Sequence, residues 1–125
     1  MKHFIITFIG ALLIAAPAGA AGSRMDFTLS GQSAFRITPT TAAAGNPWIA
    51  YAPAVGGLPA WNSGGGGGAE QWMFDHYLAN GIAIAGIYAG DLSGNTDQRA
   101  GYTNLYNEMT INLGYAEQFS FYGRA

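Results

Sequence analysis

The chain contains no cysteine and little charge. The lack of cysteine excludes disulfides and CxxC sites, so its stability must come from an apolar core. Five Lys and Arg residues against seven Asp and Glu residues give a formal net charge of −2, without a basic cluster. Nucleic acid is therefore excluded as a partner, because binding its backbone requires clustered cationic side chains. No HExxH pattern is present either, and the sequence implies neither a metal site nor a cofactor.

An apolar run near the start of the chain is too short to span a membrane, and it lies in a segment with the layout of a secretory signal peptide, residues 1–20. A basic start precedes the apolar run Phe4–Ala16, and small residues follow up to Ala20. The run is shorter than the roughly 20 residues that span a bilayer, so a cleaved leader is favoured over a membrane anchor. We expect cleavage near Ala20, no stable membrane span, and a secreted or periplasmic protein whose single domain is residues 21–125.

The remaining sequence predicts a globular rather than a disordered domain, since half of the chain is hydrophobic and one residue in ten is charged. Alternating runs at 26–30 and 34–38 predict a hairpin with a loop at 31–33. The later expected elements are a strand at 48–52, a helix at 69–80 ending at Asn80-Gly81, a strand at 82–90 covered on both faces, a helix from Arg99 that Gly114 closes, and a strand at 118–123. This order, a hairpin followed by β-α-β-α-β, predicts an α/β sheet with helical crossovers.

The final strand is expected to be an interior strand of such a sheet. Strands covered by helices need neighbours on both sides, and an apolar unpaired edge promotes aggregation. Either a partner completes the sheet or the sequence is a fragment, and we favour the fragment.

Four stretches together resemble the N-terminal part of a secreted branch of the α/β-hydrolase family. They are "NPWIAYAP", "EQWMFDHYLANGIAIAGIYAGDLSGN", "RAGYTNLYNEM" and "FSFYGRA". In order and spacing they are similar to a core strand opened by Pro-Trp, a helix, a "GIAIAGIDVG"-like strand, an "ALY"-type helix, and a strand leading to a "GRSRGG"-like nucleophile elbow. The resemblance covers residues 25–125 and implies an incomplete, truncated α/β-hydrolase-type sheet.

The resemblance places Ala125 at the position of the family's nucleophilic serine, after Gly123 and Arg124. A sharp strand-to-helix turn there lifts a serine Oγ above the sheet, and the amide of the next residue faces the oxyanion. Alanine has no oxygen that can attack a carbonyl carbon. The family's acid and histidine follow the nucleophile in the sequence, and neither lies within this chain. The alternative is that "FSFYGRA" is only a strand and a tail.

The family also takes an oxyanion-hole amide from the loop between its third strand and first helix. Ala54 and Val55 are the preferred candidates, because the loop leaves the strand at its catalytic end. Gly64–Gly68 has no preceding histidine of an HGGG loop and no Lys-Ser/Thr of a phosphate loop, so a flexible connection is favoured there.

Asp91 is a candidate for the rim of the pocket, because loops at the carboxyl ends of strands surround the site in α/β folds. Residues 91–97 carry alternate oxygens as a calcium loop does, but the glycine is at the fourth place and Tyr102 replaces the bidentate glutamate. His76 precedes the nucleophile position, so a structural or surface role is favoured over catalysis. The aromatic residues Trp48, Trp72, Phe74 and Tyr77 are expected to pack in the core rather than to form a ligand cage.

The resemblance implies serine-dependent hydrolysis of a small-molecule ester or similar acyl bond by the complete protein, without a cofactor. The chain as it stands is expected to be inactive. Two alternatives remain open: a non-catalytic pseudohydrolase that serves as a binding or interaction module, and a decayed product without function. The sequence leaves the substrate and the oligomeric state undetermined.

Overall fold

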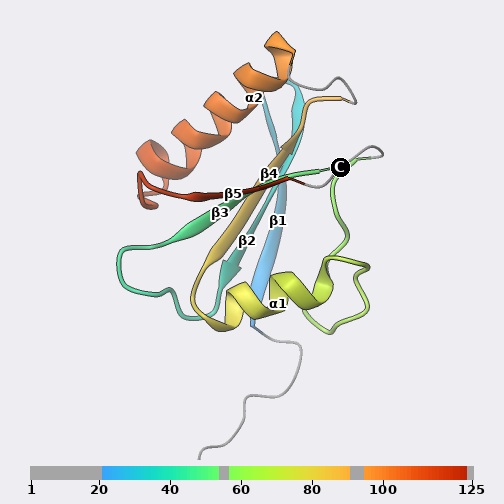
Figure 1. Cartoon of the computed structure of the whole chain (residues 1–125), viewed down its shortest axis with the longest axis vertical. Coiled ribbons are helices and arrows are strands. Elements are labelled where there is room, and N and C mark those ends of the chain that lie inside the picture. Colours follow the sequence, from blue (N-terminus) through green and yellow to red (C-terminus); the bar gives the residue numbers. More distant parts are fainter. Residues whose placement is uncertain (1–20, 54–56, 91–94, 124–125) are drawn as a thin grey trace, which may run out of the picture.

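A computed structural model describes residues 21–53, 57–90 and 95–123. Within these ranges the chain forms a five-stranded mixed sheet with a helix on either face (Figure 1). The elements are β1 (Gly22–Leu29), β2 (Gln32–Pro39), β3 (Trp48–Ala52), α1 (Gln71–Ala79), β4 (Ala83–Tyr88), α2 (Thr96–Asn107), a π-helical turn (Glu108–Asn112) and β5 (Ser120–Gly123). This order confirms the predicted hairpin followed by β-α-β-α-β.

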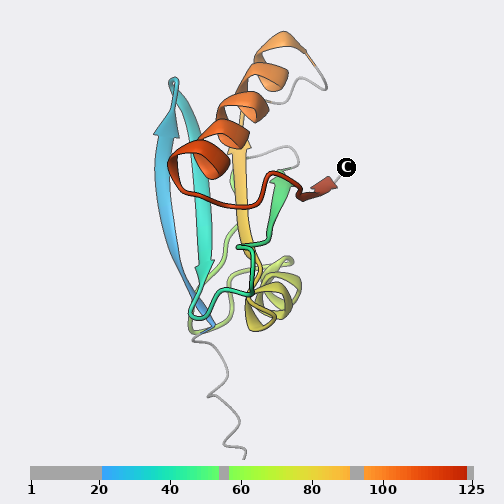
Figure 2. The ribbon, with the colours of Figure 1, turned by 90° about the vertical axis from the view of Figure 1, so that its left-hand side faces the viewer.

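The strands lie in the order β1-β2-β4-β3-β5. The pairs β1–β2 and β2–β4 are antiparallel, whereas β3 runs parallel to both β4 and β5. Figure 2 shows the β1–β2 hairpin on one side of the molecule and β5 on the other. The three parallel strands therefore share one direction, and their carboxyl ends lie at the same end of the sheet.

The hairpin differs from its prediction in the length of its loop. Only Ser30 and Gly31 lie between the strands, because Gln32 and Ser33 already belong to β2 and pair with Leu29 and Thr28. Ser30 has φ 47° and Gly31 has φ 80°. Two successive positive φ angles are typical of the tight hairpin turn whose twist matches that of the flanking strands. The predicted loop 31–33 was therefore wrong: the loop is Ser30 and Gly31, and the second strand begins two residues earlier than predicted.

Side-chain alternation divides the core into two layers, one on each face of the sheet. The layer under α2 contains the buried residues Ala34, Trp48, Ala50, Ala83, Ala85, Ile87, Leu105 and Met109. The layer under α1 contains Phe35, Ile37, Tyr51, Trp61, Phe74, Leu78 and Ile84. Because β4 contributes buried residues to both layers, the prediction that this strand is covered on both faces is confirmed.

Helix α1 presents a different face to the sheet than the aromatic pattern indicated. Its buried residues are Gln71, Phe74 and Leu78, at the spacing of one helical stripe. Trp72 is 79% exposed and stacks on exposed His76, so the expectation that Trp72 packs in the core was wrong. The helix ends as predicted, at Asn80 and Gly81, with Gly81 at φ 75°. Its amide donates to the carbonyl of Leu78, which is a glycine C-terminal cap.

Strand β5 lies at one edge of the described sheet and pairs with β3 alone. All four of its residues are exposed, including Phe121 and Tyr122 at 57% and 41%. The expected interior position is thus not seen within the described residues. Aromatic contacts join β5 to both faces of the sheet: Phe121 meets Tyr102 edge-on on the α2 face, and Tyr122 stacks on Tyr51 on the α1 face.

Candidate functional site

The carboxyl ends of three parallel strands define one end of the sheet (Figure 1). Ala52, the last residue of β3, is the register partner of Gly123, the last residue of β5. Tyr51, one residue earlier, is the register partner of Gly86 in β4. The chain segments that leave β3, β4 and β5 therefore start side by side, which is where ligands bind in open α/β sheets.

The four predicted site residues follow these strand ends in the sequence. Ala54, Val55, Asp91 and Ala125 all lie outside the described residues, and so does the predicted leader 1–20. Their roles therefore remain predictions.

The buried side chain of Tyr51 makes contacts with other aromatic rings near this end of the sheet. Its side chain is 1% exposed, and its hydroxyl donates a hydrogen bond of 2.9 Å to Oε1 of Glu70. The ring meets Phe74 of α1 edge-on and lies parallel to Tyr122 of β5 at a centroid distance of 5.8 Å. One buried side chain thus contacts the helix on this face and the last part of β5.

Polar contacts also order the far side of this end, where α2 begins. The side chain of Asn95 caps α2 by accepting from the amide of Gln98 at 2.8 Å. The side-chain nitrogen of Gln98, Nε2, donates to the carbonyl of Gly90 at 3.1 Å, and this hydrogen bond connects the start of the helix to the chain leaving β4. Further along α2, burial raises the pKa of Tyr102, the partner of Phe121.

The glycine tract belongs to a different part of the molecule and is not a purely flexible connection. The side-chain oxygen of buried Gln71 accepts from the amides of Asn62 and Gly67 at 3.0 and 2.9 Å. Its nitrogen donates to the Asn62 carbonyl and to both carboxylate oxygens of Asp75, and the indole of Trp61 donates to Asp75 as well. Both ends of the tract are therefore anchored, and only Gly64, Gly65 and Gly66 have open space around them.

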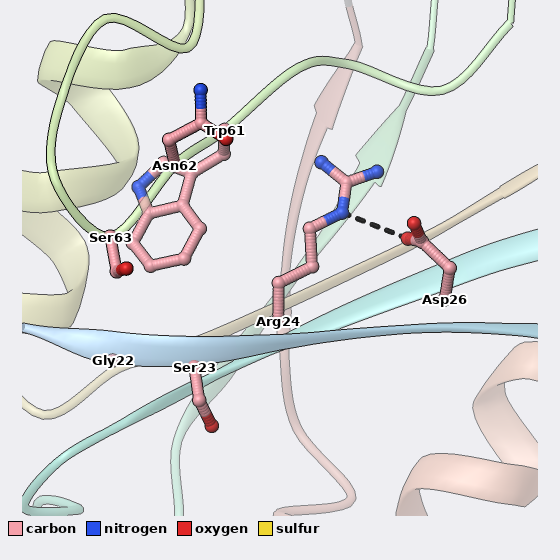
Figure 3. A pocket seen from close by; sticks show the side chains of 7 residues that line it. All are labelled: Gly22, Ser23, Arg24, Asp26, Trp61, Asn62 and Ser63. Atoms are coloured by element: carbon pink, nitrogen blue, oxygen red, sulfur yellow. Dashed lines mark hydrogen bonds and ion pairs between the residues drawn. The ribbon is translucent and has the colours of Figure 1, made fainter.

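A polar cleft of about 380 Å³ lies between the start of β1 and the segment 61–63 (Figure 3). Figure 3 shows the Arg24 side chain on the same side of β1 as Trp61, with Asp26 beside it and Ser23 pointing the other way. Arg24 donates to Asp26 at 2.8 Å and to the carbonyl of Pro59 at 2.5 Å. Because Asp26 neutralises the guanidinium charge, the cleft does not attract an anion strongly.

A second cleft, of about 470 Å³, lies at the beginning of β3 and β5 and includes Trp48, Tyr77 and Phe119. The cleft at Arg24 is also near the strand beginnings, since Arg24 pairs with Ile37 and Ile37 pairs with Ile84 at the start of β4. Both clefts are therefore at the end of the sheet opposite the carboxyl ends of the parallel strands. Neither of them is part of the predicted catalytic end.

The residues that organise the described part of the site were missed by sequence reasoning. Glu70 and Gln71 were noted only as the start of a helix, although their side chains hold Tyr51 and the glycine tract. A sequence signal existed for Gln71: a polar residue in the buried stripe 71, 74 and 78 needs hydrogen-bond partners. His76 is exposed, so it lies on the surface of the helix.

Within the residues described by the structure, no helix has the length and apolar character needed to cross a membrane.

No protein-family model matches the sequence, and no curated protein does. Among solved structures, the crystal structure of an esterase, E25, is similar with a TM-score of 0.51 at 15% sequence identity. The similarity covers 83% of this chain but only 32% of the esterase, so the chain spans about a third of that protein's length. A likeness at this identity shows the fold alone: the described chain has the α/β architecture of part of a hydrolase-type sheet.

Proposed function

We propose that this chain is the N-terminal part of a secreted serine α/β-hydrolase, and that the complete protein hydrolyses a small-molecule ester or a similar acyl bond. The observation that carries the proposal is the register of β3 with β5. Ala52 and Gly123 are paired at the carboxyl ends of their strands. The chain leaving β3 and the chain leaving β5 therefore begin as neighbours, as required if one supplies an oxyanion-hole amide and the other the nucleophile.

In this proposal each predicted residue has a distinct position in the reaction. Ala125 occupies the nucleophile position two residues beyond Gly123, and the backbone around Ala54 and Val55 supplies an amide for the oxyanion. Asp91 contributes to the pocket rim after β4. The acid and the histidine come from sequence beyond this chain, and no cofactor takes part.

The alanine at position 125 makes the chain as given inactive, because a methyl group cannot form an acyl-enzyme. The same residue favours a second candidate function, a non-catalytic pseudohydrolase that binds a ligand or partner at the carboxyl end of the sheet. A decayed product without function is the outcome to be separated from both.

The proposal is tested on the longest product that the source cell makes, purified with Ala125 and as Ala125→Ser, using p-nitrophenyl acetate as the substrate. The enzyme proposal predicts no acyl transfer with alanine and a burst of p-nitrophenol with serine. If the complete product carries alanine and the serine variant is also inactive, while the product remains folded, the binding-module candidate is favoured instead.

A further inference from the structure

We infer that Glu70 and Tyr51 are positioning residues that hold the end of β5 at Gly123. The inference rests on the proposed function, in which the nucleophile position follows this strand end in the sequence. It assigns a role to two residues that contact neither the substrate nor the reacting atoms.

Tyr51 is fixed in orientation by contacts on several sides. Its ring meets Phe74 edge-on at 5.1 Å and Phe35 edge-on at 6.4 Å, and its side chain is 1% exposed. Its hydroxyl is held by Glu70 at 2.9 Å. A buried phenol needs a hydrogen-bond acceptor, so a change at Glu70 alters the position that Tyr51 prefers.

The same ring supports β5 from one face. Tyr51 and Tyr122 are register partners, and their rings are nearly parallel, with an interplanar angle of 13° and a centroid distance of 5.8 Å. β5 has four residues and, among the described strands, pairs only with β3. Because β5 has backbone pairing on one described side only, side-chain contacts also hold it, and the Tyr51–Tyr122 stack is the one next to Gly123.

Glu70 is itself held by the beginning of α1. It immediately precedes the helix, and its carbonyl accepts from the amide of Phe74 at 2.9 Å. The positive end of the helix dipole favours a carboxylate at this place. The start of α1 is thereby connected through Glu70 and Tyr51 to Tyr122, the residue that precedes Gly123, so the helix helps to set the position of the strand end.

The test is hydrogen–deuterium exchange read by mass spectrometry, on the full chain carried by a soluble fusion partner. The variants are Glu70→Ala, Glu70→Gln and Tyr51→Phe. Glu108→Ala is the matched control, because Glu108 also accepts a side-chain hydrogen bond, from Asn112, but on the surface of the π-helical turn. Peptides covering 119–123 report on β5, and peptides from β1 and β2 report on the rest of the sheet.

Glu70→Ala and Tyr51→Phe are expected to speed exchange in 119–123 about fivefold, as loss of a hydrogen bond of about 1 kcal/mol implies. Peptides of β1 and β2 should stay unchanged. Glu70→Gln should restore slow exchange, because its amide oxygen also accepts from the phenol. Should the fusion with Tyr51→Phe unfold, Tyr122→Leu removes the Tyr51–Tyr122 stack from a half-exposed position and must also speed exchange in 119–123 while leaving β1 and β2 unchanged.

The inference is overturned if exchange rises equally in all strands, if Glu70→Gln behaves like Glu70→Ala, or if 119–123 do not respond. Each of these results is independent of catalysis. An inactive complete protein with a Glu70-dependent strand end would reject the proposed function and leave the positioning role intact, whereas an active protein without this dependence would do the reverse.

Discussion

Ala52 and Gly123 are paired across the parallel strands β3 and β5, each as the last residue of its strand. This pairing brings together two chain segments that are separated by 70 residues of sequence and a helix on each face of the sheet. The strand ends that precede the predicted oxyanion loop and the predicted nucleophile position are therefore neighbours, although the predicted residues themselves lie outside the described structure.

Gly86 is predicted to be essential for the close packing of β4. A Cβ at this position would lie 2.5 Å from Cε1 of Phe35 and 2.5 Å from the carbonyl oxygen of Tyr51. Because the strand backbone cannot move away easily, Gly86→Ala should lower the free energy of unfolding by about 1–3 kcal/mol. Urea denaturation measures the loss. Gly64→Ala is the control, since no atom lies within 4 Å of the added Cβ, and a similar loss in both variants would contradict the argument.

Gln71 is predicted to anchor the glycine tract. In Gln71→Ala the amides of Asn62 and Gly67 lose their acceptor, and Gly67 is buried. The free energy of unfolding should fall by about 2 kcal/mol, because unsatisfied polar groups cost about 1–3 kcal/mol each and the loop can relax toward water. Limited proteolysis should show new cleavage within 62–68. Gln118→Ala, at an exposed position, should leave the cleavage pattern unchanged; if Gln71→Ala does so too, the anchor is not needed.

The edge strand β5 is predicted to cause aggregation of the isolated chain. It carries Phe121 and Tyr122 on an edge with no charged residue, whereas the opposite edge strand carries Arg24 and Asp26. A lysine on such an edge discourages pairing with other chains, so Phe121→Lys should increase the soluble fraction severalfold.

Ile111→Lys is the control for that experiment. Ile111 is 74% exposed but lies in the π-helical turn, away from any strand edge. Sedimentation of freshly refolded protein measures the soluble fraction. Equal improvement by the two lysines would mean that general hydrophobicity, rather than the open edge, causes the aggregation.

Export with removal of the leader is predicted to yield a protein that begins at Ala21. The small residues Ala18 and Ala20 fit the recognition site of a signal peptidase. N-terminal sequencing of protein collected outside the cytoplasm measures the cleavage point, and Ala18→Arg should block processing. Recovery of the unprocessed chain from the cytoplasm would contradict the proposed secretion.

The sequence predicted the element order well because the apolar runs are clear. Trp48–Ala52 was predicted to the residue, and Asn80-Gly81 marked the end of α1. The buried face of α1 was mistaken because aromatic residues were taken as core, while the helix buries Gln71 and leaves Trp72 exposed. Gln71 can be buried because its partners, Asn62, Gly67 and Asp75, come together only after folding.

The candidate site was predicted only as far as local motifs reach. Sequence spacing placed Ala125 beyond a strand, but the partner of that strand was set by tertiary pairing. The contact of Tyr51 with both Glu70 and Tyr122 depends on the register of β3 with β5, which no local pattern encodes.

The most direct measurement is to sequence the source DNA through codon 125 and several hundred bases beyond it, from independent clones. The account predicts an open frame that encodes the second glycine of the elbow soon after position 125 and, later, an acidic residue and a histidine. A serine codon at 125 in those clones would identify a catalytic enzyme directly. A confirmed alanine followed at once by a stop codon would contradict the account, and the chain would then be a product without the proposed catalytic site.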